Sequence, residues 1–234
     1  MNMMNLKNWR KNAFILMIIG PTQYIILTTI AMLFYAGGTL IDPSSPGYVF
    51  WGNFFSDLGR IIALSGNSNI ISFTIFTITA LILSFTFFPF SFAIPGFFKL
   101  DKKQFLLSKI GSLLGIICIS FFIAGIFTPW DIFTSTHLIF SNLFNLTGVV
   151  VIFFYTLAIL YNREYPNIYA YIYLTLFSFA IIYTIILLKL PKSITTEGLI
   201  IQVSLQKMVH YLFLVCFLIQ GYGAWKQEKL NYNK

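Results

Sequence analysis

Charged residues are scarce in this chain of 234 residues, of which only 9% are Asp, Glu, Lys or Arg. Soluble domains carry about 25% charged residues, and no stretch here is long or polar enough for a separate soluble domain. Cysteine is nearly absent, because only Cys118 and Cys216 occur, each within an apolar run. They provide no disulfide framework and no cysteine-based zinc site. No HExxH or CxxC spacing occurs, so a local metal-binding motif is lacking too.

Apolar side chains are abundant instead. The chain is 58% hydrophobic and 19% aromatic, with a mean hydropathy of +0.82. A membrane-spanning helix needs about 20 apolar residues, and six such runs lie at 13–35, 69–90, 109–127, 136–160, 168–188 and 199–224. The sequence therefore predicts an all-α fold, in which residues 1–234 form a single integral membrane domain, a polytopic bundle of six transmembrane helices.

The net charge of +8 is unevenly distributed. Most of the 15 basic residues precede the first predicted span, lie between the second and third or the fourth and fifth, or follow the sixth. With six alternating spans, these positions share one side of the membrane. An excess of Lys and Arg marks the cytoplasmic side, so we expect a multi-pass cell-membrane protein with both termini in the cytoplasm. This placement favours membrane lipids as partners, including anionic head groups, and argues against nucleic acid.

The longest connection, residues 37–69, follows the first predicted span. It begins with the turn-rich stretch 42–47 and continues as the aromatic and apolar stretch 48–60. The second stretch is too short to span a membrane, and its Trp and Tyr residues are typical of the head-group level. We therefore expect a short interfacial or re-entrant helix after the first span.

Two aspartates and two histidines are among the ionisable residues that interrupt this lipid-like sequence: Asp57, Asp131, His137 and His210. Ionisable groups are costly in a bilayer, and those that occur there usually face a protein interior or a watery cavity. Histidine can ligate a metal or move protons, and aspartate can ligate a metal or act as a general base. All four are therefore candidate catalytic residues. They are also candidate ligands for zinc or another divalent metal that would activate a water molecule.

Polar residues recur every four positions in two predicted spans, which places them on one helix face. They are His137, Ser141 and Asn145 in the fourth span, and Gln202, Gln206 and His210 in the sixth. These stripes predict an outward-facing polar pocket, to which we also assign Asn53, Ser56, Arg60 and Lys207. The competing interpretation is that these side chains hydrogen-bond between helices and only hold the bundle together.

Two short motifs resemble a known family. Asn53–Gly59 reads N-F-F-S-D-L-G, and Gly125–Asp131 reads G-I-F-T-P-W-D before His137. They resemble the prokaryotic six-span membrane family called domain of unknown function 998, which carries N-x-x-S-D-L-G after its first span and a G-x-F-P-x-D turn before a histidine. Thr128 is an insertion relative to that turn. The resemblance selects Asn53, Ser56, Asp57, Gly59, Pro129, Asp131 and His137.

That family is distantly similar to the Frag/DRAM/Sfk group, some of whose members are linked to glycolipid remodelling or phospholipid distribution. By this analogy we expect a protein that binds or moves a lipid or small solute through the outward-facing pocket. The first alternative is a membrane-embedded, metal-dependent hydrolase or transferase acting on a lipid. The second is a structural or accessory membrane subunit. Convergence of the acidic residues and histidines would favour the enzyme, and a groove without converging acids would favour binding.

Overall fold

The structure is a computed structural model that describes residues 8–189 and 195–232. Within these residues six helices are long and apolar enough to cross a membrane, which confirms the predicted all-α bundle and identifies an integral membrane protein. The long helices are α2 (Trp9–Leu33), α3 (Ile70–Ala93), α4 (Lys102–Ile126), α5 (Thr134–Tyr161), α6 (Ile168–Lys189) and α7 (Thr196–Tyr232). Two short 3₁₀ helices, η1 (Phe55–Gly59) and η2 (Ile94–Phe98), follow α2 and α3.

Two helices extend well beyond the predicted apolar spans. Helix α4 begins at Lys102, seven residues before the predicted span, because the Asp101 side chain accepts a hydrogen bond from the backbone N–H of Gln104 and caps a basic first turn. Helix α7 ends at Tyr232, eight residues after the predicted span. An apolar run locates only the part of a helix that lies in hydrocarbon, whereas the helix itself continues into the polar layer.

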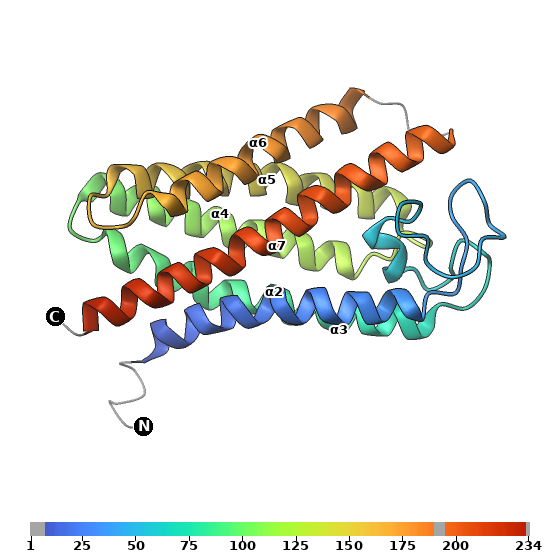
Figure 1. Ribbon diagram of the computed structural model, residues 1–234, viewed down its shortest axis with the longest axis horizontal. Helices are drawn as coiled ribbons and strands as arrows, with labels where there is room; N and C mark the ends of the chain where they lie inside the picture. Colours follow the sequence, from blue (N-terminus) through green and yellow to red (C-terminus); the bar gives the residue numbers. More distant parts are fainter. Residues whose placement is uncertain (1–7, 190–194, 233–234) are drawn as a thin grey trace.

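The long helices form a closed ring in chain order. Each packs against its neighbours in the sequence, and α7 closes the ring against α2. Figure 1 shows the elongated bundle, with residues 34–69 gathered at one end and the start of α2 and the end of α7 at the other. We call these the loop end and the terminal end.

Aromatic side chains fill the interior of the ring. The Phe217 ring lies 4.9 Å from that of Phe87, 4.7 Å from that of Phe213 and 5.7 Å from that of Tyr173, measured between ring centroids. These four residues come from α3, α6 and α7, so one aromatic cluster joins three helices. Edge-to-face and tilted ring pairs stabilise such a cluster beyond the area that they bury.

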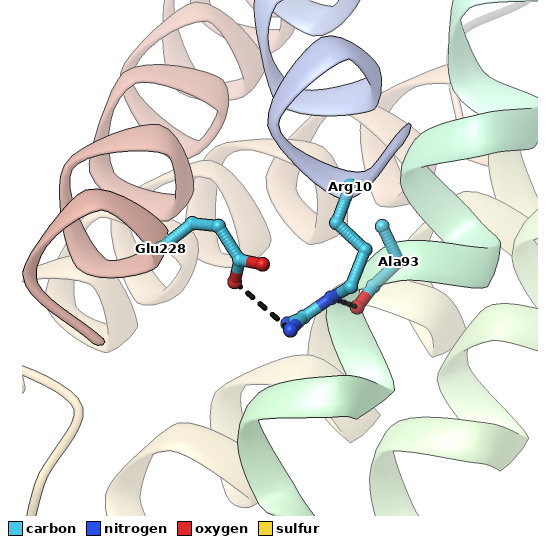
Figure 2. Close-up of polar contacts among 3 residues, drawn as sticks. All are labelled: Arg10, Ala93 and Glu228. Atoms are coloured by element: carbon cyan, nitrogen blue, oxygen red, sulfur yellow. Dashed lines mark hydrogen bonds and ion pairs between the residues drawn. The ribbon is translucent and has the colours of Figure 1, made fainter. Parts of the chain in front are cut away.

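Arg10 ties three elements together at the terminal end. Figure 2 shows its guanidinium between the carboxylate of Glu228 on α7, at 2.9 Å, and the carbonyl oxygen of Ala93 on α3, at 3.3 Å. The guanidinium also lies 4.7 Å from the centroid of the Phe97 ring and packs directly on Gly96. Cation–π contact and a carboxylate partner compensate the partly buried charge.

Residues 34–69 are mostly irregular. The expected short helix is present, but it consists only of the five-residue 3₁₀ helix η1. Gly37 and Gly38 both have positive φ, and a side chain on Gly38 would overlap the backbone of Leu64 and Ser65. The segment therefore folds back on itself through a close backbone approach that only glycine permits.

Substitutions at two glycines on different helices test how closely the helices pack. A Cβ added at Gly20 in α2 would overlap the side chain of Thr86 in α3, whereas one at Gly148 in α5 meets only the Cys118 sulfur, at 3.7 Å. We expect Gly20→Ala to lower the free energy of unfolding by about 1–3 kcal/mol through overpacking. Gly148→Ala should leave it unchanged or raise it by up to about 1 kcal/mol through helix propensity. Unfolding in detergent measures both, and equal effects would contradict the close α2–α3 contact.

Candidate functional site

Asn53 organises the loop end. Its side chain is fully buried and donates to the carbonyl oxygen of Gly38 at 2.8 Å and to Asp57 Oδ2 at 3.2 Å, while accepting from the backbone N–H of Val49 at 2.9 Å. Asp57 Oδ2 also accepts from the backbone N–H of Phe54, at 2.8 Å. The N-x-x-S-D segment is thus a closed hydrogen-bonded unit around one buried amide.

Two adjacent side chains of α7 hold this unit against the bundle. Lys207 is buried, and its Nζ donates to the carbonyl oxygen of Asn53. The same Nζ lies 5.0 Å from the centroid of the Phe50 ring and 5.4 Å from that of Phe55, within cation–π range. Gln206 Oε1 accepts from the backbone N–H of Phe55, at 3.0 Å. Helix α7 therefore positions η1 through both a charge and a neutral amide.

The Asp57 carboxyl group has an unusually high pKa. Burial raises its pKa from 3.8 to about 6, although hydrogen bonds from Asn53 and Phe54 and the nearby charges of Arg60 and Lys207 oppose this rise. Its Oδ1 atom is buried and has no hydrogen-bond partner among the described residues. Burial therefore favours the protonated form of Asp57 at a pH where an exposed aspartate would be ionised.

The raised pKa predicts a pH-dependent stability. Between about pH 4 and pH 6 the folded protein binds this proton more tightly than the unfolded chain, so stability falls as pH rises through that window and levels off above it. The full effect is on the order of 3 kcal/mol. Asp57→Asn, which cannot ionise, should flatten the slope of unfolding free energy against pH in detergent. An unchanged slope in that variant would assign the effect to another group.

Asp131 joins two connections at the loop end. Its carboxylate accepts hydrogen bonds from the backbone N–H of Ile61, at 3.1 and 3.2 Å, and from that of Ile62, at 2.9 Å. Arg60 donates from Nε to the carbonyl oxygen of Ile62 at 3.2 Å, and its guanidinium lies 5.8 Å from the Trp130 ring centroid. The carboxylate thus fixes the α4–α5 turn against the segment that follows η1.

Removing this carboxylate should loosen the loop end locally. Asp131→Ala leaves two backbone N–H groups without their partner, which costs about 1–3 kcal/mol. We expect faster hydrogen exchange in residues 60–63 by mass spectrometry. Asp42→Ala is the matched control, because among the described residues the Asp42 carboxylate bonds only to Ser44, within its own exposed turn. Equal acceleration of residues 60–63 in both variants would contradict the assignment.

His137 closes the α4–α5 turn. Its Nδ1 lies 2.8 Å from the carbonyl oxygen of Thr128 and 3.2 Å from that of Gly125. Since carbonyl oxygens only accept, the proton resides on Nδ1 and Nε2 is left as an acceptor. The ring stacks 6.4 Å from the Trp130 ring, centroid to centroid. The G-x-F-T-P-W-D turn and the histidine that follows it therefore form one local structure.

A cavity of about 150 Å³ lies inside the ring beneath η1. Both predicted polar stripes reach it: its polar lining comprises Ser56, His137, Ser141, Asn145, Gln206 and His210, together with Tyr24 and Tyr183. Phenylalanines of η1 and of helices α3, α4, α5 and α7 form much of the remaining wall. The cavity therefore combines an apolar wall with hydrogen-bonding groups from η1 and from helices α2, α5, α6 and α7.

His210 is the most distinctive group in this cavity. Its ring lies between Phe55, at 4.5 Å, and Tyr24, at 5.4 Å, measured between centroids. Its Nε2 is buried and lacks a hydrogen-bond partner among the described residues. Burying a polar atom in this way is costly unless a ligand or a water molecule supplies the partner.

The four candidate metal ligands belong to different settings. Asp57 and Asp131 are bonded to loop amides and do not line the cavity, whereas His137 and His210 do. Within residues 8–189 and 195–232, no three side chains of His, Cys, Asp or Glu come together as a metal ion would require. Gln202 is buried on α7 but is not part of the cavity wall.

Sequence reasoning missed the aromatic wall and a second, deeper cavity of about 40 Å³. This lower cavity shares Gly148 and His210 with the upper one and continues toward Ser84, Ser91 and Tyr155. Serines and a tyrosine within apolar spans carry no spacing signal that separates a cavity wall from ordinary helix packing.

Comparison with known proteins gave no match to any family model, curated protein or solved structure.

Proposed function

We propose that this protein binds an amphipathic ligand, a lipid or a small solute, in the cavity at the loop end. The observation that carries the proposal is His210 Nε2, a buried polar atom in the cavity wall without a partner among the described residues. Ser56, Asn145 and Gln206 lie in the same wall and offer further hydrogen bonds. Ligand sites are typically concave and mostly apolar, with a few polar groups that orient the ligand.

The size of the cavity limits what it holds. An apolar cavity of about 150 Å³ accommodates benzene in another protein, so the upper cavity takes a compact group rather than a whole lipid. The lower cavity, reached past Gly148, offers apolar space for a short continuation. A polar group near His210 with an apolar extension toward Phe217 matches both parts.

We retain the resemblance to domain of unknown function 998 as a proposal, and a lipid ligand agrees with the distant similarity of that family to the Frag/DRAM/Sfk group. We further propose that the loop end faces outward and the terminal end the cytoplasm, since Lys99, Lys102 and Lys109 gather at the terminal end. The hydrolase alternative has less support, because neither Asp57 nor Asp131 reaches the cavity. No specific contact within the described residues favours the accessory-subunit alternative.

Filling the cavity tests the proposal. A Cβ at Gly148 would meet the Cys118 sulfur only at van der Waals distance, so Gly148→Leu should fit, occupy the cavity and abolish binding of 1-hexanol, a compact amphipathic probe. Gly148→Ala is the matched control and should retain binding. His210→Phe, which keeps the ring and removes Nε2, should weaken binding about ten-fold through the lost hydrogen bond. Native mass spectrometry of the detergent-solubilised protein measures all three.

A second control lies on the lipid-facing side of α4. Ser120 is exposed, and within the described part of the chain its hydroxyl bonds only to Ile116 of its own helix, so Ser120→Ala should leave probe binding unchanged. If Gly148→Leu binds the probe as well as the unsubstituted protein does, the cavity is not the binding site. Full binding by His210→Phe would contradict the role assigned to Nε2.

A further inference from the structure

A third recess, of about 330 Å³, lies at the terminal end, between α2, the α3–η2 junction and α4. We call it the basic groove. Three cationic side chains line it, Arg10, Lys99 and Lys109, and no carboxylate does among the described residues. The groove therefore presents positive charge from three different elements to a single space.

The three cations differ in how they are held. Arg10 is fixed by Glu228 and by the carbonyl oxygen of Ala93 (Figure 2), and its Nη2 is buried without a hydrogen-bond partner in the described part of the chain. Lys99 and Lys109 are exposed. Lys109 Nζ lies 4.9 Å from the Phe105 ring centroid, also in the groove wall. The Arg10 guanidinium is thus held in place, whereas the Lys99 and Lys109 side chains are free to adjust to a bound anion.

The same groove has an apolar side. Phe92 is 64% exposed and Leu113 is 61% exposed, although both line the groove and lie within membrane-spanning helices. Large apolar side chains with this exposure face acyl chains in a membrane. The groove therefore runs from cationic groups at its polar end to hydrocarbon along α3 and α4.

We propose that the basic groove binds an anionic phospholipid. The phosphate would lie between Lys99 and Lys109 beside Arg10, and an acyl chain would lie along Phe92 and Leu113. Basic pockets between transmembrane helices on the cytoplasmic side bind anionic head groups in this way. Charge complementarity selects the head group, and the exposed apolar side chains select a lipid over a soluble phosphate. This site is independent of the cavity at the loop end.

A charge-removal experiment tests the site. The full-length protein in neutral detergent is titrated with dioleoylphosphatidylglycerol, and bound lipid is measured by native mass spectrometry. The double variant K99Q/K109Q should weaken binding at least ten-fold, since each lysine near an anionic lipid contributes roughly five-fold. The matched control K102Q/K226Q removes two exposed cations from the same end, outside the groove, and should change binding less than two-fold.

A further variant tests the apolar side of the groove, and a stability measurement shows whether the variants remain folded. Leu113→Ala keeps all three cations and should weaken lipid binding about three-fold through lost apolar contact. Thermal unfolding without lipid should be the same for every variant, because the substituted side chains are exposed.

Four results would overturn the proposal. Equal losses in the two double variants would show diffuse electrostatic attraction. Equal binding of dioleoylphosphatidylcholine would show that charge does not select the lipid. Full competition by glycerol 3-phosphate at equal concentration would identify a soluble phosphate site. Unchanged binding in Leu113→Ala together with unchanged binding in K99Q/K109Q would place the lipid elsewhere.

Discussion

The contact between α7 and η1 determines the shape of the loop end. Lys207 and Gln206 are consecutive, and together they bond the carbonyl of Asn53 and the N–H of Phe55. Phe55 and the adjacent Ser56 form part of the cavity wall. The cavity therefore exists in its present form only while α7 holds η1, and a change in the Lys207 contact would alter the cavity wall directly.

This dependence follows from the irregular backbone of the segment. Buried backbone N–H and C=O groups that no helix pairs must find hydrogen-bond partners elsewhere in the protein. The Asn53 side chain, the Asp57 carboxylate and the Asp131 carboxylate each bond backbone groups within residues 34–69. Buried polar and charged groups at this end thus have a structural use. A buried ionisable residue in a membrane protein does not by itself indicate catalysis, although it marks where to look.

The helices could be predicted from the sequence because an apolar run of about twenty residues matches the thickness of a bilayer and is rare in soluble domains. The convergence of Asn145 and His210 on one cavity was likewise predictable in outline, since four-residue spacing fixes a helix face. The partners of Asp131 could not be predicted, because they are the backbone N–H groups of Ile61 and Ile62. A backbone group has no sequence signature. The role of Arg10 was hidden for a similar reason: its partner Glu228 lies at the other end of the chain.

The polar groups at the two ends of the bundle differ in how far folding has removed them from water. At the terminal end, Lys99 and Lys109 are exposed and need no partner to be stable, so an anion there adds an interaction without replacing one. At the loop end, His210 Nε2 is already desolvated by folding. The cost of burying that atom is met before any ligand arrives, so a hydrogen bond to it contributes more to affinity than an equivalent bond to a solvated group. Under the two proposals, a ligand in the cavity would gain from a hydrogen bond to an atom that is already desolvated, whereas an anionic lipid in the basic groove would gain from charge and from the exposed apolar side chains.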